Sequence, residues 1–467
     1  MYAARRWSVQ HARTLQRIYD ACARLAPLFA PALRLIGARR AERWLVPLEH
    51  AAKKFLFDCK MCGQCALSHT GMACPTNCKK QMRNGPCGGV RPDGGCEVDP
   101  AMRCVWIEAL AGARLTGAPS LPALLPVDHR RQNRSSWIPV IEARQPELLV
   151  RRERTSSVER PPDERPVSGS FEQACRSGRF VVTAEVAPPD SADPAALIGR
   201  ARAFDGLVDA LNITDGAGGN CHMSSVAASA ILVEHGFTPV YQVACRDRNR
   251  IAIQGDILGA AALGVRNVLC LTGDDVSQGD QPQAKPVFDL DAVSLLGIAR
   301  AMRDDGVFAS GRKLETPPRL FLGATANPFV PPHLDRIANL ERKIAAGAQF
   351  IQTQFCFDVA LLESFMREVR ARGLHRHCKF IIGVGALRSA RALRRMASMV
   401  PGVHIPEQVI ARVDRADDQK LEGQRVCIET MLAVAQIEGV GGVHLMGHRN
   451  EDVLAQIIVE SGLRRAV

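Results

Sequence analysis

The stretch Val181-Val182-Thr183-Ala184-Glu185-Val186 decides the fold, because it is the first of eight short apolar runs in residues 171–467. The other runs are residues 208–214, 238–245, 267–272, 319–326, 350–357, 379–384 and 442–446. Strands that are apolar almost throughout are buried on both faces, as in a parallel sheet. Eight of them, alternating with segments of helical length, predict an α/β fold of the (β/α)8 TIM-barrel type.

A doubly wound open sheet is the alternative arrangement for alternating strands and helices. Such folds commonly bind dinucleotides through a Gly-x-Gly-x-x-Gly turn that opens a helix. The sequence contains no such turn after any of the apolar runs. This favours the barrel.

The first third of the chain has a different composition. Residues 1–57 carry apolar side chains at helical spacing, for example Ile18, Cys22 and Leu25. A cysteine-dense block follows, and then a stretch rich in Pro, Arg and Ser, which is typical of a linker. The sequence therefore predicts a small helical, cysteine-rich metal-binding domain in residues 1–115, a linker in 116–170 and the barrel in 171–467.

The net charge of +12 lies entirely in residues 1–170, where 27 Lys and Arg face 15 Asp and Glu. No nucleic-acid-binding motif accompanies this charge, and metal-bound thiolates would cancel part of it, so we expect no nucleic acid partner. No apolar stretch is long enough to span a membrane, and no secretory signal opens the chain. We expect a cytoplasmic protein.

Eight of the sixteen cysteines lie within a short block. They are Cys59, Cys62, Cys65, Cys74, Cys78, Cys87, Cys96 and Cys104. Dense cysteine without a secretory signal indicates metal rather than disulfides. The spacing suits Fe–S clusters and tetrahedral zinc equally, so two [4Fe–4S] clusters, one cluster with one zinc, and two zincs all remain open. A pair of zincs that only staple a small domain is the structural alternative.

The cysteine block resembles the small-subunit domain that partners methylenetetrahydrofolate reductases in acetogens and related bacteria. The similarity covers residues 15–140 and includes Cys-x-x-Cys-Gly-x-Cys from Cys59, Cys-Pro-x-x-Cys from Cys74, Arg83-Asn-Gly-Pro-Cys-Gly-Gly and Cys104-Val-Trp. It implies a domain that carries Fe–S and zinc or one of them, and that docks on a reductase barrel.

Glu185 is a carboxylate inside an otherwise apolar run. Burying it is costly unless it has a partner or a task, and burial would raise its pKa into the range of a general acid near neutral pH. Active sites of barrels gather at the carboxyl ends of the strands, where Glu185 lies. A structural ion pair with an arginine of a neighbouring strand is the alternative.

Residues 170–465 resemble the barrel of methylenetetrahydrofolate reductase. The Glu-x-x-x-Pro-Pro pattern from Glu185, Thr272-Gly-Asp, Asn339-Leu-x-x-Lys and Thr353-Gln-Phe-x-Phe-Asp recur in order. The resemblance implies an oxidoreductase that interconverts 5,10-methylenetetrahydrofolate and 5-methyltetrahydrofolate through bound FAD, or alternatively FMN, with NAD(P)H or another electron donor. It also implies a homo-oligomer.

The same resemblance implies roles for individual residues. Glu185 matches the acid that assists opening of the methylene bridge, Asp274 the acid near flavin and folate, and Gln354 the glutamine that binds the pterin. Thr214, Asn339 and Lys343 match flavin contacts.

Three expected cofactor contacts depart from the family pattern. Gln242 stands where better-known bacterial reductases have histidine, Thr272 replaces an arginine, and Asn327 belongs to a segment that replaces Tyr-Pro-Glu-x-His. We include these residues among the candidate cofactor contacts. The changed nicotinamide surface beside a cysteine-rich domain suggests that electrons arrive through that domain from another protein.

Two other functions compete. A folate-dependent methyltransferase on a similar barrel would need an activated thiolate at the barrel mouth, and Cys245, Cys270 and Cys356 are isolated. A non-catalytic Fe–S electron-transfer partner whose barrel only binds folate is the other alternative.

Overall fold

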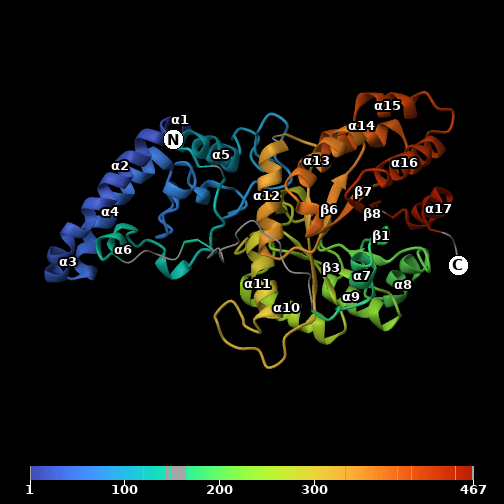
Figure 1. The fold of residues 1–467 in the computed structure, drawn as a ribbon, viewed down its shortest axis with the longest axis horizontal. Coiled ribbons are helices and arrows are strands. Elements are labelled where there is room, and N and C mark those ends of the chain that lie inside the picture. Colours follow the sequence, from blue (N-terminus) through green and yellow to red (C-terminus); the bar gives the residue numbers. More distant parts are fainter. Residues whose placement is uncertain are drawn as a thin grey trace. The chain divides into compact units, whose positions relative to one another are not determined.

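The computed structural model describes residues 2–118, 120–143, 148–149, 165–331, 333–386, 388–400, 402–447 and 449–464 (Figure 1). The chain divides into two compact units, one within Met1–Cys87 and Asp93–Val158 and the other within Gly88–Pro92 and Glu159–Val467. Of the predicted linker, 116–170, the structure describes residues 116–118, 120–143, 148–149 and 165–170.

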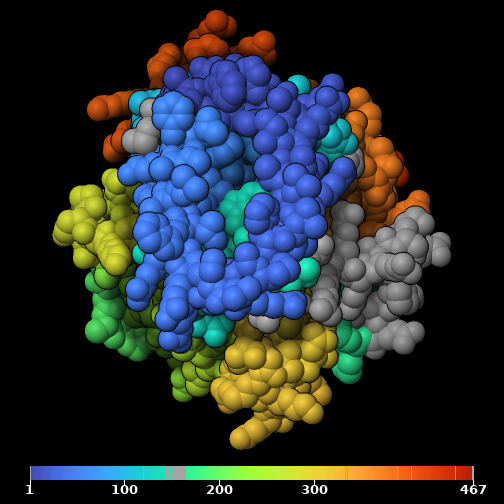
Figure 2. Space-filling view, turned by 90° about the vertical axis from the view of Figure 1, so that its left-hand side faces the viewer, coloured from blue at the N-terminus to red at the C-terminus, as the bar shows by residue number. Residues whose placement is uncertain are grey.

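The first unit opens with helices and continues in irregular backbone that carries the cysteines. Figure 2 shows the side formed by its N-terminal helices, in blue. The α-helices are α1 (Tyr2–Gln10), α2 (Ala12–Leu25), α3 (Ala30–Ile36), α4 (Ala38–Phe57), α5 (Val105–Thr116) and α6 (Trp137–Ile141). Short 3-10 turns are η1 (Ala26–Phe29), η2 (Leu67–His69), η3 (Pro75–Asn77) and η4 (His129–Arg131). The helices predicted for residues 1–57 are confirmed.

Close backbone approach holds the cysteine segment against α5. A Cβ on Gly112 of α5 would lie 2.0 Å from the carbonyl oxygen of Gly71, which itself has φ +55°. Only glycine fits at both positions, since a side chain would separate the two backbones. Trp106 on the same helix is almost completely buried, which fixes the helix in this small core.

The second unit is a closed barrel of eight parallel strands in the order β1 to β8. The strands are β1 (Val181–Val186), β2 (Ala210–Ile213), β3 (Pro239–Ala244), β4 (Asn267–Leu271), β5 (Phe321–Ala326), β6 (Phe350–Phe355), β7 (Lys379–Val384) and β8 (Val440–Leu445). Strand β1 pairs with β8 through Val182 opposite Val443, which closes the sheet. The predicted (β/α)8 fold is confirmed.

Helices follow the strands and bury one face each against the sheet. The α-helices are α7 (Ser170–Arg176), α8 (Pro194–Arg202), α9 (Ser225–Glu234), α10 (Arg250–Ala262), α11 (Ala292–Asp304), α12 (His333–Ala346), α13 (Val359–Ala371), α14 (Ala390–Met399), α15 (Glu407–Asp414), α16 (Gln419–Ala435) and α17 (Glu451–Ser461). Short turns are η5 (Ala217–Gly219), η6 (Val276–Gln278) and η7 (Leu374–Arg376).

Helix α7 precedes the first strand and closes the amino-terminal end of the barrel. Its Phe171 is completely buried and meets the rings of Phe321 and Phe350 edge-on, at centroid distances of 5.6 and 5.5 Å. Edge-to-face aromatic pairs are favourable beyond the area that they bury. This end of the barrel is therefore a packed core.

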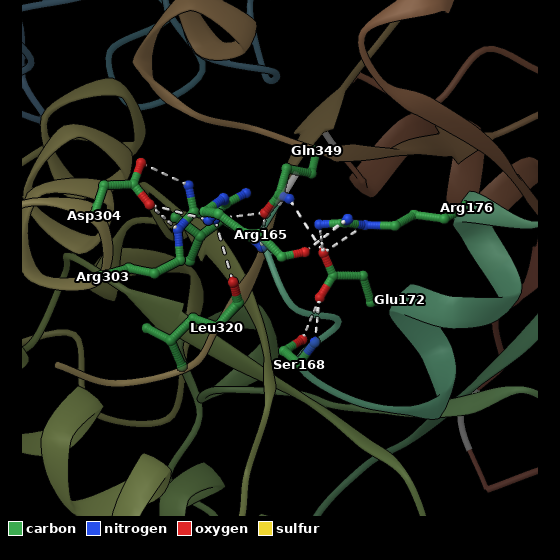
Figure 3. A network of polar contacts seen from close by, with 9 residues as sticks. Arg165, Ser168, Glu172, Arg176, Arg303, Asp304, Leu320 and Gln349 are labelled. Carbon is green, nitrogen blue, oxygen red and sulfur yellow. Dashed lines mark hydrogen bonds and ion pairs between the residues drawn. The ribbon is translucent and has the colours of Figure 1, made fainter. Parts of the chain in front are cut away.

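A polar network surrounds this apolar plug (Figure 3). The buried carboxylate of Glu172 accepts hydrogen bonds from the Ser168 hydroxyl at 2.6 Å and from Arg176 Nε at 2.9 Å. Gln349 donates to Glu172 at 3.4 Å and accepts from Arg303 at 2.5 Å, which joins the plug to the strands. Every carboxylate oxygen of Glu172 is thus paired, and the network stabilises the closed end.

Within the part of the chain that is described, no helix combines the length and the apolar character that a membrane crossing requires.

Candidate functional site at the barrel mouth and the cysteine block

Glu185 lies at the carboxyl end of β1, where the barrel opens. Its neighbour in register on β2 is Asn212, and Val186 follows it as a fully buried side chain. Burial and, to a lesser extent, the negative charge of Glu451 at the start of α17 together raise the pKa of Glu185 to about 7. The carboxyl is therefore half-protonated near neutral pH, which is the condition that a general acid needs.

One layer deeper, four buried polar side chains meet across the barrel. The amide of Asn212 donates to Gln352 at 2.5 Å, and Gln352 donates back at 3.1 Å. Thr183 lies two residues before Glu185 on β1, and its hydroxyl is 2.9 Å from Nδ1 of His444. Burial lowers the pKa of His444 to about 3, so its imidazole is neutral. Sequence reasoning missed this layer, because only the register shows which strands' side chains meet.

Thr214 follows β2 and is almost completely buried. Its hydroxyl oxygen makes no hydrogen bond within the described residues. A buried hydroxyl without a partner costs free energy, which a bound group could recover. The cofactor role of Thr214 stays a prediction.

The next residue, Asp215, ties the mouth loops together. Its carboxylate accepts hydrogen bonds from the hydroxyl of Ser225 at 2.9 Å and from the backbone of Ala244 at 2.8 Å, and it pairs with Arg248. Arg248 also pairs with Asp256 at 3.0 Å. These interactions fix the ends of β2 and β3 relative to each other.

Arg246 is a buried cation at the mouth that sequence reasoning did not select. Its guanidinium donates to the carbonyl oxygen of Gly216 at 2.9 Å and pairs with Asp247 at 2.7 Å. Gly216 has φ +60°, and a Cβ there would lie 2.3 Å from the guanidinium. The positive φ favours glycine, and a side chain at this position would have to displace the guanidinium. Adjacent arginine and aspartate residues in the sequence are the only signal that could have pointed to it.

Asp274, predicted to act near the folate, is exposed after β4. Its carboxylate accepts a hydrogen bond from the backbone of Gly218 at 3.0 Å. The structure therefore brings Asp274 to the loop after β2, beside the segment that holds Arg246. The negative charge of Asp274 also contributes to raising the pKa of Arg246, although burial acts in the opposite direction and Asp247 contributes more.

Gln354, Gln242 and Thr272 lie at the ends of β6, β3 and β4. Gln354 is half-buried, and its side-chain oxygen accepts from the backbone of Phe355 at 3.0 Å. Gln242 is buried on β3. The hydroxyl of Thr272 accepts a hydrogen bond from the backbone of Ala292 at 3.3 Å. All three lie at the same end of the barrel as Glu185.

The remaining candidates belong to β5 and α12. Asn327 donates through its amide to the carbonyl oxygens of Gly88 at 3.0 Å and Gly402 at 2.8 Å, so its side chain already holds two backbone segments. Lys343 donates to the carbonyl oxygen of Thr325 at 2.6 Å. Asn339 is buried one turn earlier on α12. Their cofactor roles stay predictions.

The isolated barrel cysteines are buried thiols. Burial raises the pKa of Cys270 and of Cys356 to about 12, and it raises that of Cys245 well above the ordinary value. A thiol must ionise to act as a nucleophile. Burial therefore disfavours the thiolate at all three positions.

The first four cysteines of the block share one cavity. Its lining includes Cys59, Cys62, Cys65 and Cys74. Burial and, to a lesser extent, the charges of the other three thiolates together raise the pKa of Cys74 to about 12. Lys53 also lines this cavity and donates to Glu49 at 2.6 Å.

The other four cysteines form a second set. Burial raises the pKa of Cys104 to about 12, with contributions from Cys78 and Cys96. The charges of Cys104 and Cys78 in turn add to the raised pKa of Cys87, whose thiol donates to Glu97 at 3.1 Å. The thiols of each set are thus close enough to interact electrostatically. No three His, Cys, Asp or Glu side chains of the described residues are arranged as a ready ligand group for a metal ion.

Two family patterns match the chain. The family described as "Methylenetetrahydrofolate reductase" matches residues 170–462, and that described as "Methylene-tetrahydrofolate reductase C terminal" matches residues 39–121. The first covers more than half of the chain. The match to residues 39–121 includes all eight cysteines of the block.

Two curated proteins are similar to part of the chain. One is "Probable methylenetetrahydrofolate reductase (NADPH)" of Caenorhabditis elegans, 25% identical over 249 residues, which are 51% of this chain and 34% of that protein. The other is "Methylenetetrahydrofolate reductase 2" of Schizosaccharomyces pombe, 25% identical over 262 residues, which are 54% of this chain and 40% of that protein. The similarity therefore spans two fifths or less of either relative.

Among solved structures, a protein of Clostridium thermocellum described as binding two copies of 5-methyl-5,6,7,8-tetrahydrofolic acid is similar, with a TM-score of 0.46 and 13% identity. It covers 64% of this chain and matches over 100% of its own length.

Proposed function

Because the chain belongs to the methylenetetrahydrofolate reductase family, we propose that it is an oxidoreductase that interconverts 5,10-methylenetetrahydrofolate and 5-methyltetrahydrofolate. One observation carries the proposal. Glu185 lies at the mouth of the barrel with a pKa of about 7. An acid that is protonated at neutral pH is what opening of the methylene bridge requires, since the departing nitrogen must receive a proton.

The residues at the mouth divide this work. Glu185 donates the proton that opens the bridge to an N5 iminium. Asp274 faces the folate from the end of β4 and stabilises the positive charge that develops there. Gln354 orients the pterin through hydrogen bonds. The neutral Thr183–His444 pair beneath Glu185 adds no charge that would lower its pKa.

A flavin would be held at the same end of the barrel. The unpartnered hydroxyl of Thr214 supports this, because a buried donor at the mouth fits a bound polar group. The further contacts would come from the set Gln242, Thr272, Asp274, Asn327, Asn339 and Lys343. FAD or FMN bound there would supply hydride transfer, with NAD(P)H or another donor as the source of electrons.

The variant Glu185→Gln tests the proposal. It keeps the shape of the side chain and removes the proton, so turnover of methylenetetrahydrofolate should fall by about 10²- to 10⁴-fold. Binding of 5-methyltetrahydrofolate, measured by calorimetry, should change little. Glu451→Gln is the matched control, since it removes the neighbouring carboxylate and should keep most of the turnover.

Retention of full turnover in Glu185→Gln would refute the role of Glu185 as the acid. Loss of folate binding in the same variant would instead mean that Glu185 is a binding residue.

We also propose that the cysteine block holds metal in two sites, one from Cys59, Cys62, Cys65 and Cys74 and one from Cys78, Cys87, Cys96 and Cys104. The electrostatic coupling within each set supports this division. An Fe–S cluster would supply one-electron transfer and zinc would not. A cluster would make the block a candidate entry for electrons from a donor protein.

Anaerobic purification with iron, zinc and sulfide analysis tests the metal proposal. Cys65→Ser should remove the metal of the first set alone, and Cys96→Ser that of the second alone. Loss of all metal in either variant would contradict two separate sites. Rapid oxidation of NADH by the purified protein with methylenetetrahydrofolate as the acceptor, at a rate unchanged after the metal is removed, would contradict electron entry through the block.

A further inference from the structure

The N-terminal helices expose an unusual number of bulky apolar side chains. Leu35 is 90% exposed and Trp44 82% exposed. The exposed apolar set of η1, α3 and α4 consists of Leu28, Phe29, Leu35, Ile36, Trp44, Leu48 and Phe55. Single exposed apolar residues are ordinary, but seven within 28 residues of chain indicate a surface that is covered in use.

Helix α4 shows the pattern most clearly. Trp44, Leu48 and Phe55 are spaced four and seven residues apart, so they lie along one side of the helix. The opposite side carries Glu49, which is buried and paired with Lys53. Helix α4 therefore has two apolar sides. One apolar side packs into the unit through residues such as Phe57, and a second apolar stripe faces outward.

The exposed charges of helices α2 to α4 all have one sign. Residues 12–57, which the structure describes throughout, carry eight exposed charged side chains, and all are cations. They are Arg13, Arg17, Arg24, Arg34, Arg39, Arg40, Arg43 and Lys54. The three acids of this stretch are not exposed: Glu42 pairs with Arg134 at 3.4 Å, Glu49 with Lys53, and Asp20 accepts from Gln16 at 2.8 Å.

We propose that η1, α3 and α4 form a docking surface for an anionic lipid bilayer. Apolar side chains with tryptophan, bordered by arginine and lysine, are what an interfacial helix presents to a membrane. The leucines and aromatic rings enter the boundary between headgroups and acyl chains, while the cations meet lipid phosphates.

A protein partner fits these observations less well. Protein interfaces carry many direct hydrogen bonds and a mixed polar rim. In residues 12–57, all of them described, Thr14 is the one exposed side chain with a hydroxyl or amide group, and no exposed carboxylate is present. A surface that offers only cations and apolar groups matches a continuous sheet of phosphates over hydrocarbon.

Vesicle flotation with the full-length protein tests the proposal. Vesicles of equal parts phosphatidylcholine and phosphatidylglycerol should carry the protein to the top of the gradient, and vesicles of phosphatidylcholine alone should carry at least about tenfold less. The double variant Trp44→Glu/Leu48→Glu should lose about tenfold or more of the bound fraction on anionic vesicles. Both positions are exposed, so the fold should persist, as an unchanged melting temperature would show.

Ile251→Glu is the matched control, because Ile251 is 77% exposed on α10 of the barrel and lies outside the proposed surface. It should bind vesicles as the wild type does. A second variant, Arg39→Glu/Arg43→Glu, should lose binding to anionic vesicles, and added salt should weaken binding by the wild type.

Absence of binding to anionic vesicles would overturn the proposal, as would equal binding by the Trp44/Leu48 variant. A third outcome also overturns it. If light scattering finds an oligomer that dissociates in the Trp44/Leu48 variant and vesicles bind neither protein, the surface is an interface between copies of the chain.

Discussion

At the closed end of the barrel, the buried carboxylate of Glu172 receives hydrogen bonds from Ser168, Arg176 and Gln349, and the ring of Phe171 fills the space beside it. At the open end, the carboxyl of Glu185 faces the negative charge of Glu451, and its pKa rises to about 7. The two residues stand at opposite ends of one sheet. The carboxylate of Glu172 is stabilised by hydrogen-bond and ion-pair partners, whereas burial and a nearby negative charge destabilise the charged form of Glu185.

The difference separates stability from activity within one domain. Polar groups at the closed end form hydrogen bonds with one another, so replacing them should lower the free energy of unfolding. Groups at the open end, such as Glu185 and the unpartnered hydroxyl of Thr214, cost free energy as they stand. Their replacement should leave the fold intact or improve it. Four experiments, from the largest expected effect to the smallest, test this contrast.

Phe171→Ala should have the largest effect on stability. Removal of a fully buried ring that contacts Phe321 and Phe350 leaves a cavity and should cost about 3–5 kcal/mol. Urea unfolding followed by circular dichroism measures it. Val167→Ala, at an exposed position just before the plug, should stay within about 0.5 kcal/mol of the wild type. Equal effects of the two variants would show that α7 does not seal the barrel.

Glu172→Gln should destabilise the protein by about 2 kcal/mol, because it removes a charged acceptor from Arg176 and Ser168. Turnover per folded molecule should not change, since the network lies at the end opposite the mouth. Unfolding curves and assays on the same preparation measure both quantities. A loss of turnover without a loss of stability would contradict the division between the two ends.

Glu185→Gln should increase the free energy of unfolding, and it should do so only at neutral and alkaline pH. The folded-state pKa of Glu185 is raised from 4.5 to about 7, so the wild type loses stability as the pH rises from about 4.5 to about 7, and the loss is complete above pH 7. The variant escapes this loss. It should exceed the wild type by about 2 kcal/mol at pH 8 and match it at pH 4. Melting temperatures across this pH range measure the difference.

Glu451→Gln should have the smallest effect. Burial is the main cause of the raised pKa of Glu185 and the charge of Glu451 the lesser one. Removing that charge should shift the pH at which activity falls to a lower value, by less than about one unit. A pH–rate profile measures the shift. A shift to higher pH would show that Glu451 does not act through its charge.

Sequence alone predicted the architecture because its signals are local. A strand buried on both faces must be apolar residue by residue, and Val181–Val186 and Lys379–Val384 are found where they were expected. The position of Glu185 at the end of the first strand follows from the same pattern. The predicted eighth strand starts at residue 442, two residues after the start of β8, because Gly439 and Gly441 on either side of Val440 interrupt the apolar run.

Contacts between distant segments could not be predicted. Thr183 and His444 meet across 261 residues, and their pairing depends on the closure of β1 onto β8. Nothing near Asn327 indicates that its amide holds the carbonyl oxygens of Gly88 and Gly402. Phe171 belongs to a helix of seven residues whose sequence does not distinguish a plug from a surface turn.

The five residues Gly88–Pro92 limit how the protein can be divided into fragments. They belong to the barrel unit, although the chain before and after them belongs to the other unit. Asn327 and Arg336 donate to the backbone oxygens of Gly88 and Val90. A fragment that starts at residue 159 would lack the acceptors for Asn327 and Arg336. A fragment that ends at residue 158 would contain residues 88–92 without the barrel residues that bind them. We therefore expect that neither fragment reproduces the local structure that this loop has in the full chain.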